Sequence, residues 1–94
     1  MMILDIHQIQ AQIRRIARIG NVILSDHCKN ESMPLRNVDM LDILKVLKHG
    51  NVSHEYDPKT DIKFRVVGED IERKALTVIL LLIDEDSLYV KTVL

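Results

Sequence analysis

The spacing of the apolar residues changes at Gly50, and this change limits the folds that the chain can adopt. Before Gly50, apolar side chains recur every three or four residues, as they do along one face of a helix. After Gly50, they alternate with polar side chains or run without interruption, which is typical of strands. Helices followed by strands within 94 residues predict one α+β domain that spans residues 1–94.

The first predicted helix covers residues 6–19. Asp5 can cap its start and Gly20 can end it. Its apolar stripe consists of Ile6, Ile9, Ile13 and Ile16. Because an all-isoleucine stripe on a terminal helix packs on a partner as easily as on its own sheet, this face could also hold a homodimer or a partner protein.

A second helix is predicted over residues 26–33. Ser25 or Asp26 supplies its N-terminal cap, and Pro34 helps to end it. The short apolar run of residues 22–24 before it is either an edge strand or the lead into this helix.

The third predicted helix covers residues 40–49 and has the clearest boundaries of the three. Asp39 can cap it, with Asp42 three residues later in a weaker form of the capping box, and Gly50 stops it. Its buried stripe includes Ile43 and Leu47, so this helix is expected to act mainly as scaffold.

Four strands are predicted after Gly50, over residues 52–56, 62–68, 75–83 and 88–93. Residues 57–61 have the composition of a turn. Because the connections are short, consecutive strands should be antiparallel neighbours. The expected architecture is therefore N-terminal helices packed on a four-stranded antiparallel β-meander.

Composition excludes several classes of function. A net charge of −1 lacks the basic excess of a duplex DNA binder, and the aromatic residues Tyr56, Phe64 and Tyr89 are too few for a base-stacking nucleic-acid binder. A small nuclease stays open, because basic residues cluster early and acidic ones late. One cysteine, no signal peptide and no run long enough to cross a membrane predict a soluble cytoplasmic protein.

No metal site and no cofactor are predicted. Cys28, His49 and His54 are the residues that invite a zinc site, but they lack the paired spacing of zinc ligands. Cys28 on its own is more typical of a small packed side chain.

Several short motifs, taken in order, resemble a small bacterial family, domain of unknown function 4258. They include a His at a helix start, a Met-x-x-Arg step, a helix-ending Gly, a basic-aromatic-basic strand ending in Gly, and a final Val-x-Thr-Val strand. In this chain those positions are His27, Met33 with Arg36, Gly50, Lys63-Phe64-Arg65 with Gly68, and Val90-Lys91-Thr92-Val93.

The resemblance implies a RelE- or barnase-like fold, as in the RelE and MqsR ribonuclease toxins, and a cognate antitoxin protein with a zinc finger like that of MqsA. Two departures from the family pattern stand out. Ser32 lies where many members carry Arg, which removes one phosphate contact, and the turn after Gly68 lacks the usual second glycine.

Metal-independent RNA cleavage needs a base, an acid and cations to hold the phosphate, and the chain can supply all three. His27 is the predicted general acid or base, since histidine ionises near neutral pH; the alternative is a structural pair with Asp26 or Glu31. Arg36 could clamp phosphate or bond helix-end carbonyls.

The two basic strands supply the remaining predicted site residues. Alternation puts Lys63 and Arg65 on one face of their strand, and Tyr89 and Lys91 on one face of the last strand. These four side chains should line one polar surface with His27 and Arg36 at its rim, although an alternating basic strand is also typical of a solvated face. In that strand Thr92 is expected beside Leu88 and Val90, opposite Val93.

Two main functions follow from these observations. The first is a toxin of a toxin–antitoxin pair that cleaves RNA by 2′-OH transesterification. The alternative is a non-catalytic interaction module, such as a degenerate toxin relative or a homodimer, which works through protein contacts alone. A regulatory nucleic-acid binder without catalysis is a weaker third possibility.

Overall fold

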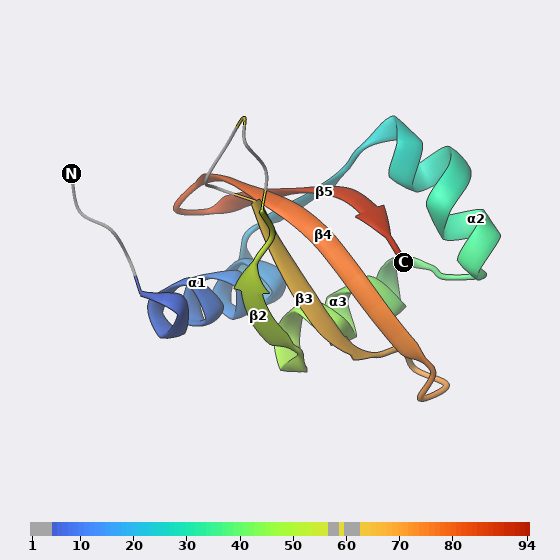
Figure 1. Ribbon diagram of the computed structural model, residues 1–94, viewed down its shortest axis with the longest axis horizontal. Coiled ribbons are helices and arrows are strands. Elements are labelled where there is room, and N and C mark those ends of the chain that lie inside the picture. The colour runs from blue at the N-terminus through green and yellow to red at the C-terminus, as the bar shows by residue number, and fades with distance from the viewer. Residues whose placement is uncertain (1–4, 57–58, 60–62) are drawn as a thin grey trace.

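The computed structural model describes residues 5–56, 59 and 63–94, and within them it is an α+β structure with helices on one side of a sheet (Figure 1). The helical elements are α1 (Ile6–Ile19), η1 (Cys28–Ser32), α2 (Met33–Arg36) and α3 (Met40–His49). The strands are β1 (Asn21–Leu24), β2 (Asn51–His54), β3 (Lys63–Glu69), β4 (Ala75–Asp84) and β5 (Ser87–Val93).

The sheet of the described residues has five strands in the order β1-β5-β4-β3-β2. The last four form the predicted antiparallel meander, but β1 pairs in parallel with β5. The α+β class is therefore confirmed, and the purely antiparallel four-stranded sheet is wrong. The short run of residues 21–24 is too brief to predict its partner, because its pairing depends on α1 crossing back to the far edge of the sheet.

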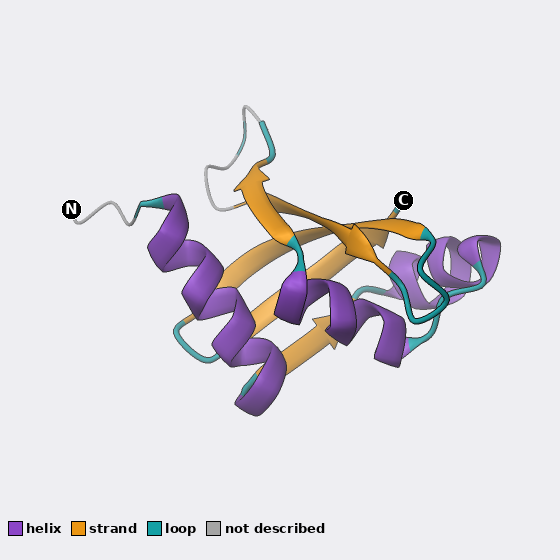
Figure 2. Cartoon of the chain, turned by 90° about the horizontal axis from the view of Figure 1, so that it is seen from below, coloured by secondary structure: helices purple, strands orange, loops and turns teal. Residues whose placement is uncertain are grey.

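The two long helices α1 and α3 lie on the same face of the sheet, behind it in Figure 1, and Figure 2 shows the two helices together on that face. The core lies between these layers. Its fully buried large side chains are Ile13, Ile16, Ile43, Val46, Leu47, Val66, Leu76, Val78, Leu80, Leu88, Val90 and Val93. The opposite face carries neither helix, and we call it the open face.

The isoleucine stripe of α1 packs against the chain's own sheet. Ile9, Ile13 and Ile16 are buried, and Ile6 is partly buried against the core. A homodimer through Ile6, Ile9, Ile13 and Ile16 would need these side chains at the surface, so the face predicted for it is already covered.

Capping boxes fix the starts of both long helices; the sequence predicts the box at Asp39, and at Asp5 only a cap. The Asp5 carboxylate accepts from the Gln8 amide while the Gln8 side chain accepts from the Asp5 amide, and Asp39 and Asp42 do the same for α3. Each box satisfies two backbone donors that a helix start otherwise leaves unpaired.

The helical segment that begins after Ser25 continues to Arg36, beyond its predicted end. Pro34 lies inside it rather than after it, at the first turn of α2. The five residues of η1 before it form a π-turn, in which the Met33 amide bonds the Cys28 carbonyl. The wider turn accommodates a proline that has no amide proton and whose ring crowds the carbonyl four residues back. Asn37, with φ of 54°, ends the segment.

A β-bulge in β5 changes which side chains reach the open face. Ile79 pairs with Thr92 but Leu80 pairs with Val90, so Lys91 is an extra residue in the ladder. The face predicted for Thr92 is therefore wrong: Val93 is buried on the helix side with Val90, and Thr92 lies opposite Ile79 on the open face. Alternation alone cannot show a bulge.

Asp42 joins α3 to the hairpin between β3 and β4. One carboxylate oxygen accepts from the Asp39 amide at 3.0 Å and the other from the Ile71 amide at 2.9 Å. These two backbone hydrogen bonds lower the pKa of Asp42 below its ordinary value, and the bond from the Asp39 amide has the larger effect.

We expect this carboxylate to contribute stability above about pH 4, where the unfolded chain also ionises it, and to lose that contribution as the pH falls through the lowered folded-state pKa. In chemical denaturation from pH 6 to pH 2, the free energy of unfolding should fall less steeply with decreasing pH for Asp42→Asn than for the natural chain. Asp26→Asn, whose side chain is 93% exposed, is the control. Parallel pH curves for the natural chain and Asp42→Asn would contradict this role.

The turn predicted at residues 57–61 lies outside the described residues except for Lys59, as does Ile62 of the predicted strand. Among the described residues, no helix combines the length and the apolar character needed to cross a membrane.

Candidate functional site

His27 lies at the rim of the open face and makes two side-chain contacts. Its Nδ1 is 2.7 Å from a carboxylate oxygen of Glu31, and its Nε2 is 3.4 Å from the Thr92 hydroxyl. An ionised carboxylate only accepts hydrogen bonds, so it favours the tautomer that has the proton on Nδ1 and the lone pair on Nε2. A histidine oriented by a carboxylate, with its free nitrogen facing a hydroxyl, has the arrangement of a general base.

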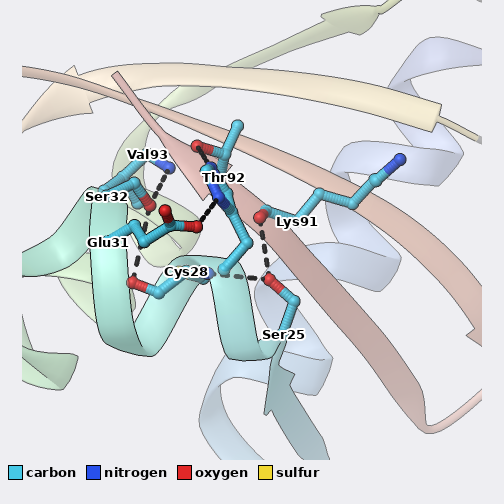
Figure 3. Close-up of polar contacts among 8 residues, drawn as sticks. Ser25, Cys28, Glu31, Ser32, Lys91, Thr92 and Val93 are labelled. Carbon is cyan, nitrogen blue, oxygen red and sulfur yellow. Dashed lines mark hydrogen bonds and ion pairs between the residues drawn. The ribbon is translucent and has the colours of Figure 1, made fainter.

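Two serine hydroxyls fix the helical segment that carries His27 against β5 (Figure 3). The Ser25 hydroxyl accepts from the Cys28 amide at 2.9 Å, as an N-terminal cap does, and donates to the Lys91 carbonyl at 2.8 Å. The Ser32 hydroxyl accepts from the Val93 amide at 3.2 Å and donates to the Cys28 carbonyl at 3.5 Å. The strand β1 ends at Leu24, so it offers no hydrogen-bond partners to the end of β5. The two serine hydroxyls bond the β5 backbone there instead, and they hold His27 beside Thr92.

The bulge also shortens the distance between Thr92 and Tyr89. Their partners on β4, Ile79 and Leu81, are two residues apart, which is about 7 Å along a strand. Tyr89 and the His27–Thr92 pair therefore flank a short stretch of the open face, with Lys91 between them in the chain.

Arg65 lies on the open face two strands from Thr92, because Ile79 pairs with both residues. Two strand spacings are about 10 Å, a gap that a phosphate and its ribose can bridge. Its guanidinium is held by Glu55, with nitrogen–oxygen distances of 3.1 and 3.3 Å. Glu55 is not among the predicted site residues, and its carboxylate neutralises part of the cation predicted to bind phosphate.

The other two basic residues of the prediction are Lys63 and Lys91. Lys63 pairs with Leu81 on the open face, in the row that also contains Tyr89. Lys91 is exposed, and its side chain extends away from Thr92 and Glu31 (Figure 3). The structure therefore places Lys63, Arg65 and Tyr89 on the predicted face, with Lys91 at the bulge, and the hydrogen bonds of His27 within the described chain go to Glu31 and Thr92.

Arg36 is not part of this arrangement. It lies nine residues after His27, about 13 Å along a helix, and it lines a pocket with Asp70, Lys74 and Leu76 near the start of β4. The predicted position at the rim of the site is wrong, because the helical segment runs on through Pro34 and carries Arg36 to its far end.

The open face is also less polar than predicted. Ile79 is 3% exposed, although neither long helix covers it, and Leu81 beside it is half-buried. Ile23 on β1 adds a further apolar side chain, in register with Tyr89. The basic and titratable groups therefore surround an apolar centre instead of forming a continuous charged surface.

The three residues that invite a zinc site lie in three different environments. Cys28 is buried, and that burial raises the pKa of its thiol. His54 packs its ring at 5.1 Å from that of Phe64, and His49 lines a different pocket beside Gly50. Within the described part of the chain, no three His, Cys, Asp or Glu side chains gather closely enough to hold a metal ion.

For two residues of the site, Glu31 and Thr92, the sequence predicts only part of the role or position. Glu31 follows His27 by four residues, which is the spacing of neighbours on a helix face, and it was expected only as a structural partner. Alternation predicts Thr92 on the opposite face of β5, because the bulge that turns it outward leaves no mark in the sequence.

Comparison with known proteins shows that residues 24–94 match the family described as a domain of unknown function (DUF4258). Because the match covers most of the chain, this protein belongs to that family. The match begins at Leu24 and so includes the whole segment that carries His27 and all of β2 to β5. No curated protein and no solved structure matches the chain.

Proposed function

We propose that this protein is the cytoplasmic toxin of a bacterial toxin–antitoxin pair and that it cleaves RNA without a metal ion, by attack of the 2′-OH. The observation that carries the proposal is the His27 ring, held by Glu31 at 2.7 Å with Nε2 directed at a hydroxyl on the open face. The 3.4 Å contact with Thr92 is long for a hydrogen bond, so a ribose hydroxyl could displace it.

In the proposed reaction, Nε2 of His27 takes the proton from the 2′-OH. The 2′-oxygen then bonds to phosphorus, and the bond from phosphorus to the 5′-oxygen breaks. The leaving 5′-oxygen takes a proton from Tyr89, whose partner on β4 lies two residues from the partner of Thr92. The products are a 2′,3′-cyclic phosphate and a 5′-hydroxyl. Arg65 offsets the charge that builds on the phosphate, and Lys63 and Lys91 hold the neighbouring phosphates.

The architecture is compatible with this proposal. An open sheet face bordered by a histidine, a tyrosine and three basic side chains can receive a single RNA strand. The resemblance to the RelE and MqsR toxins extends the proposal to a shared RelE- or barnase-like fold. A cognate antitoxin, with a zinc finger like that of MqsA, is part of the same proposal.

The proposal predicts RNA cleavage by the purified protein in EDTA. The new ends should be 2′,3′-cyclic phosphates and 5′-hydroxyls, identified by mass spectrometry of an oligoribonucleotide that contains one deoxyribose substitution at the cut. That substitution should abolish cleavage there, since it removes the attacking hydroxyl. Intact RNA in this assay, together with normal growth of cells that express the protein, would favour the non-catalytic alternative instead.

A further inference from the structure

The far end of the helical segment, where Arg36 lies, carries a pocket that the proposed active site does not use. The pocket has a volume of about 270 Å³ and lies between α2 and the start of β4. Val38, Ala75 and Leu76 contribute its apolar lining, and Leu76 is 2% exposed. Sites for drug-sized ligands begin at about 300 Å³, so this pocket suits one or two apolar side chains of a partner better than a small molecule.

Two large apolar side chains at this end of the molecule are exposed. Leu35, which lines the pocket, is 86% exposed, and Ile71, the neighbour of Asp70 in the hairpin, is 55% exposed. A single exposed leucine needs no explanation. A leucine beside a pocket with an apolar floor is different, because pockets of this kind hold the anchor residues of protein interfaces.

The charges beside the pocket indicate the chemistry of the partner. The Arg36 guanidinium forms no hydrogen bond or ion pair within the described chain. Lys74 pairs with Glu72 at 3.3 Å, but both side chains are 70% exposed, and such pairs exchange easily for another partner. The one acidic residue of the lining, Asp70, is buried, and its carboxylate accepts from the Lys74 amide. The cations therefore face outward and the carboxylate inward.

We infer that this pocket is a docking site for an acidic, amphipathic segment of a partner protein. An apolar side chain of that segment enters the pocket against Leu76, with Leu35 packed beside it. Its carboxylates pair with Arg36 and Lys74. This surface lies about 13 Å from His27 along the helical segment, and the inference does not depend on RNA cleavage.

The test uses a short synthetic peptide with leucines at helical spacing and glutamates elsewhere, and a second peptide in which lysines replace the glutamates. Both are titrated into the full ¹⁵N-labelled chain and followed by NMR. The acidic peptide should bind saturably and shift the amide signals of Leu35, Lys74 and Ala75. Arg36→Glu should weaken this binding about tenfold, and Leu35→Asp should abolish it.

Ile19→Asp is the matched control, since Ile19 is 78% exposed on α1 and does not line the pocket. It should bind the acidic peptide as the natural chain does. The inference is overturned if the lysine peptide binds equally well, if neither peptide binds at millimolar concentration, or if the shifts map to the open face around Ile23 and Tyr89.

Discussion

Replacing His27 with alanine should lower the rate of RNA cleavage by about 10²- to 10⁴-fold, the range that general acid–base catalysis by one side chain provides. The loss should appear in kcat, because His27 acts on the proton of the attacking hydroxyl and not on the rest of the RNA. The measurement is single-turnover cleavage of a defined oligoribonucleotide in EDTA.

The variant is expected to stay folded. The His27 side chain is 58% exposed, and its partners are an exposed glutamate and one loosely held hydroxyl. Circular dichroism and the thermal midpoint should therefore match those of the natural chain.

Two further variants separate catalysis from general effects of substitution. His7→Ala removes an exposed histidine of α1, on the other side of the sheet, and should cleave normally. Glu31→Gln keeps a hydrogen-bond acceptor at Nδ1 but loses its charge, which should slow cleavage roughly five- to tenfold. If His27→Ala retained more than about a tenth of the natural rate, His27 would not be the base, and its contacts with Glu31 and Thr92 would be structural.

The sequence predicts the scaffold well because local signals determine it. The cap at Asp5 and the capping box at Asp39 depend on residues three apart, and both form where the sequence predicts them. The meander from β2 to β5 follows from short connections between strands of period two. In each case the interactions that decide the structure lie within one element or between neighbours in the chain.

The site is harder to predict because it depends on contacts between distant residues. The bulge at Lys91 turns Thr92 toward His27, which precedes it by 65 residues. The π-turn before Pro34 lengthens the helical segment and carries Arg36 away from the site. Glu55 becomes the partner of Arg65 only once β2 pairs with β3. None of these features follows from the spacing of residues within one element.

Gly50 shows the same contrast between a local signal and a distant contact. The sequence predicts it as the residue that stops α3, and its amide does donate to the Val46 carbonyl at 2.7 Å. Its backbone is nevertheless extended, with φ of −76° and ψ of 171°, a conformation open to any residue. Glycine is needed there because a Cβ atom would lie 2.7 Å from the Val46 carbonyl oxygen, 2.8 Å from Val66 Cγ1 and 2.8 Å from the Val67 carbonyl oxygen.

Gly50→Ala should therefore lower the free energy of unfolding by about 2–3 kcal/mol, as overpacking in a filled core does, and the thermal midpoint by roughly 10–20 °C. Two of the three close atoms are backbone, so the end of α3 and β3 would have to separate to make room. Gly68→Ala is the matched control, since its Cβ would lie 3.3 Å from Gly50 Cα and 3.5 Å from a Val46 methyl. The control should shift the free energy of unfolding by less than about 1 kcal/mol, because alanine in a strand offsets mild crowding. Equal thermal midpoints for the two variants, measured by calorimetry, would show that α3 and β3 do not approach as closely at Gly50 as these distances require.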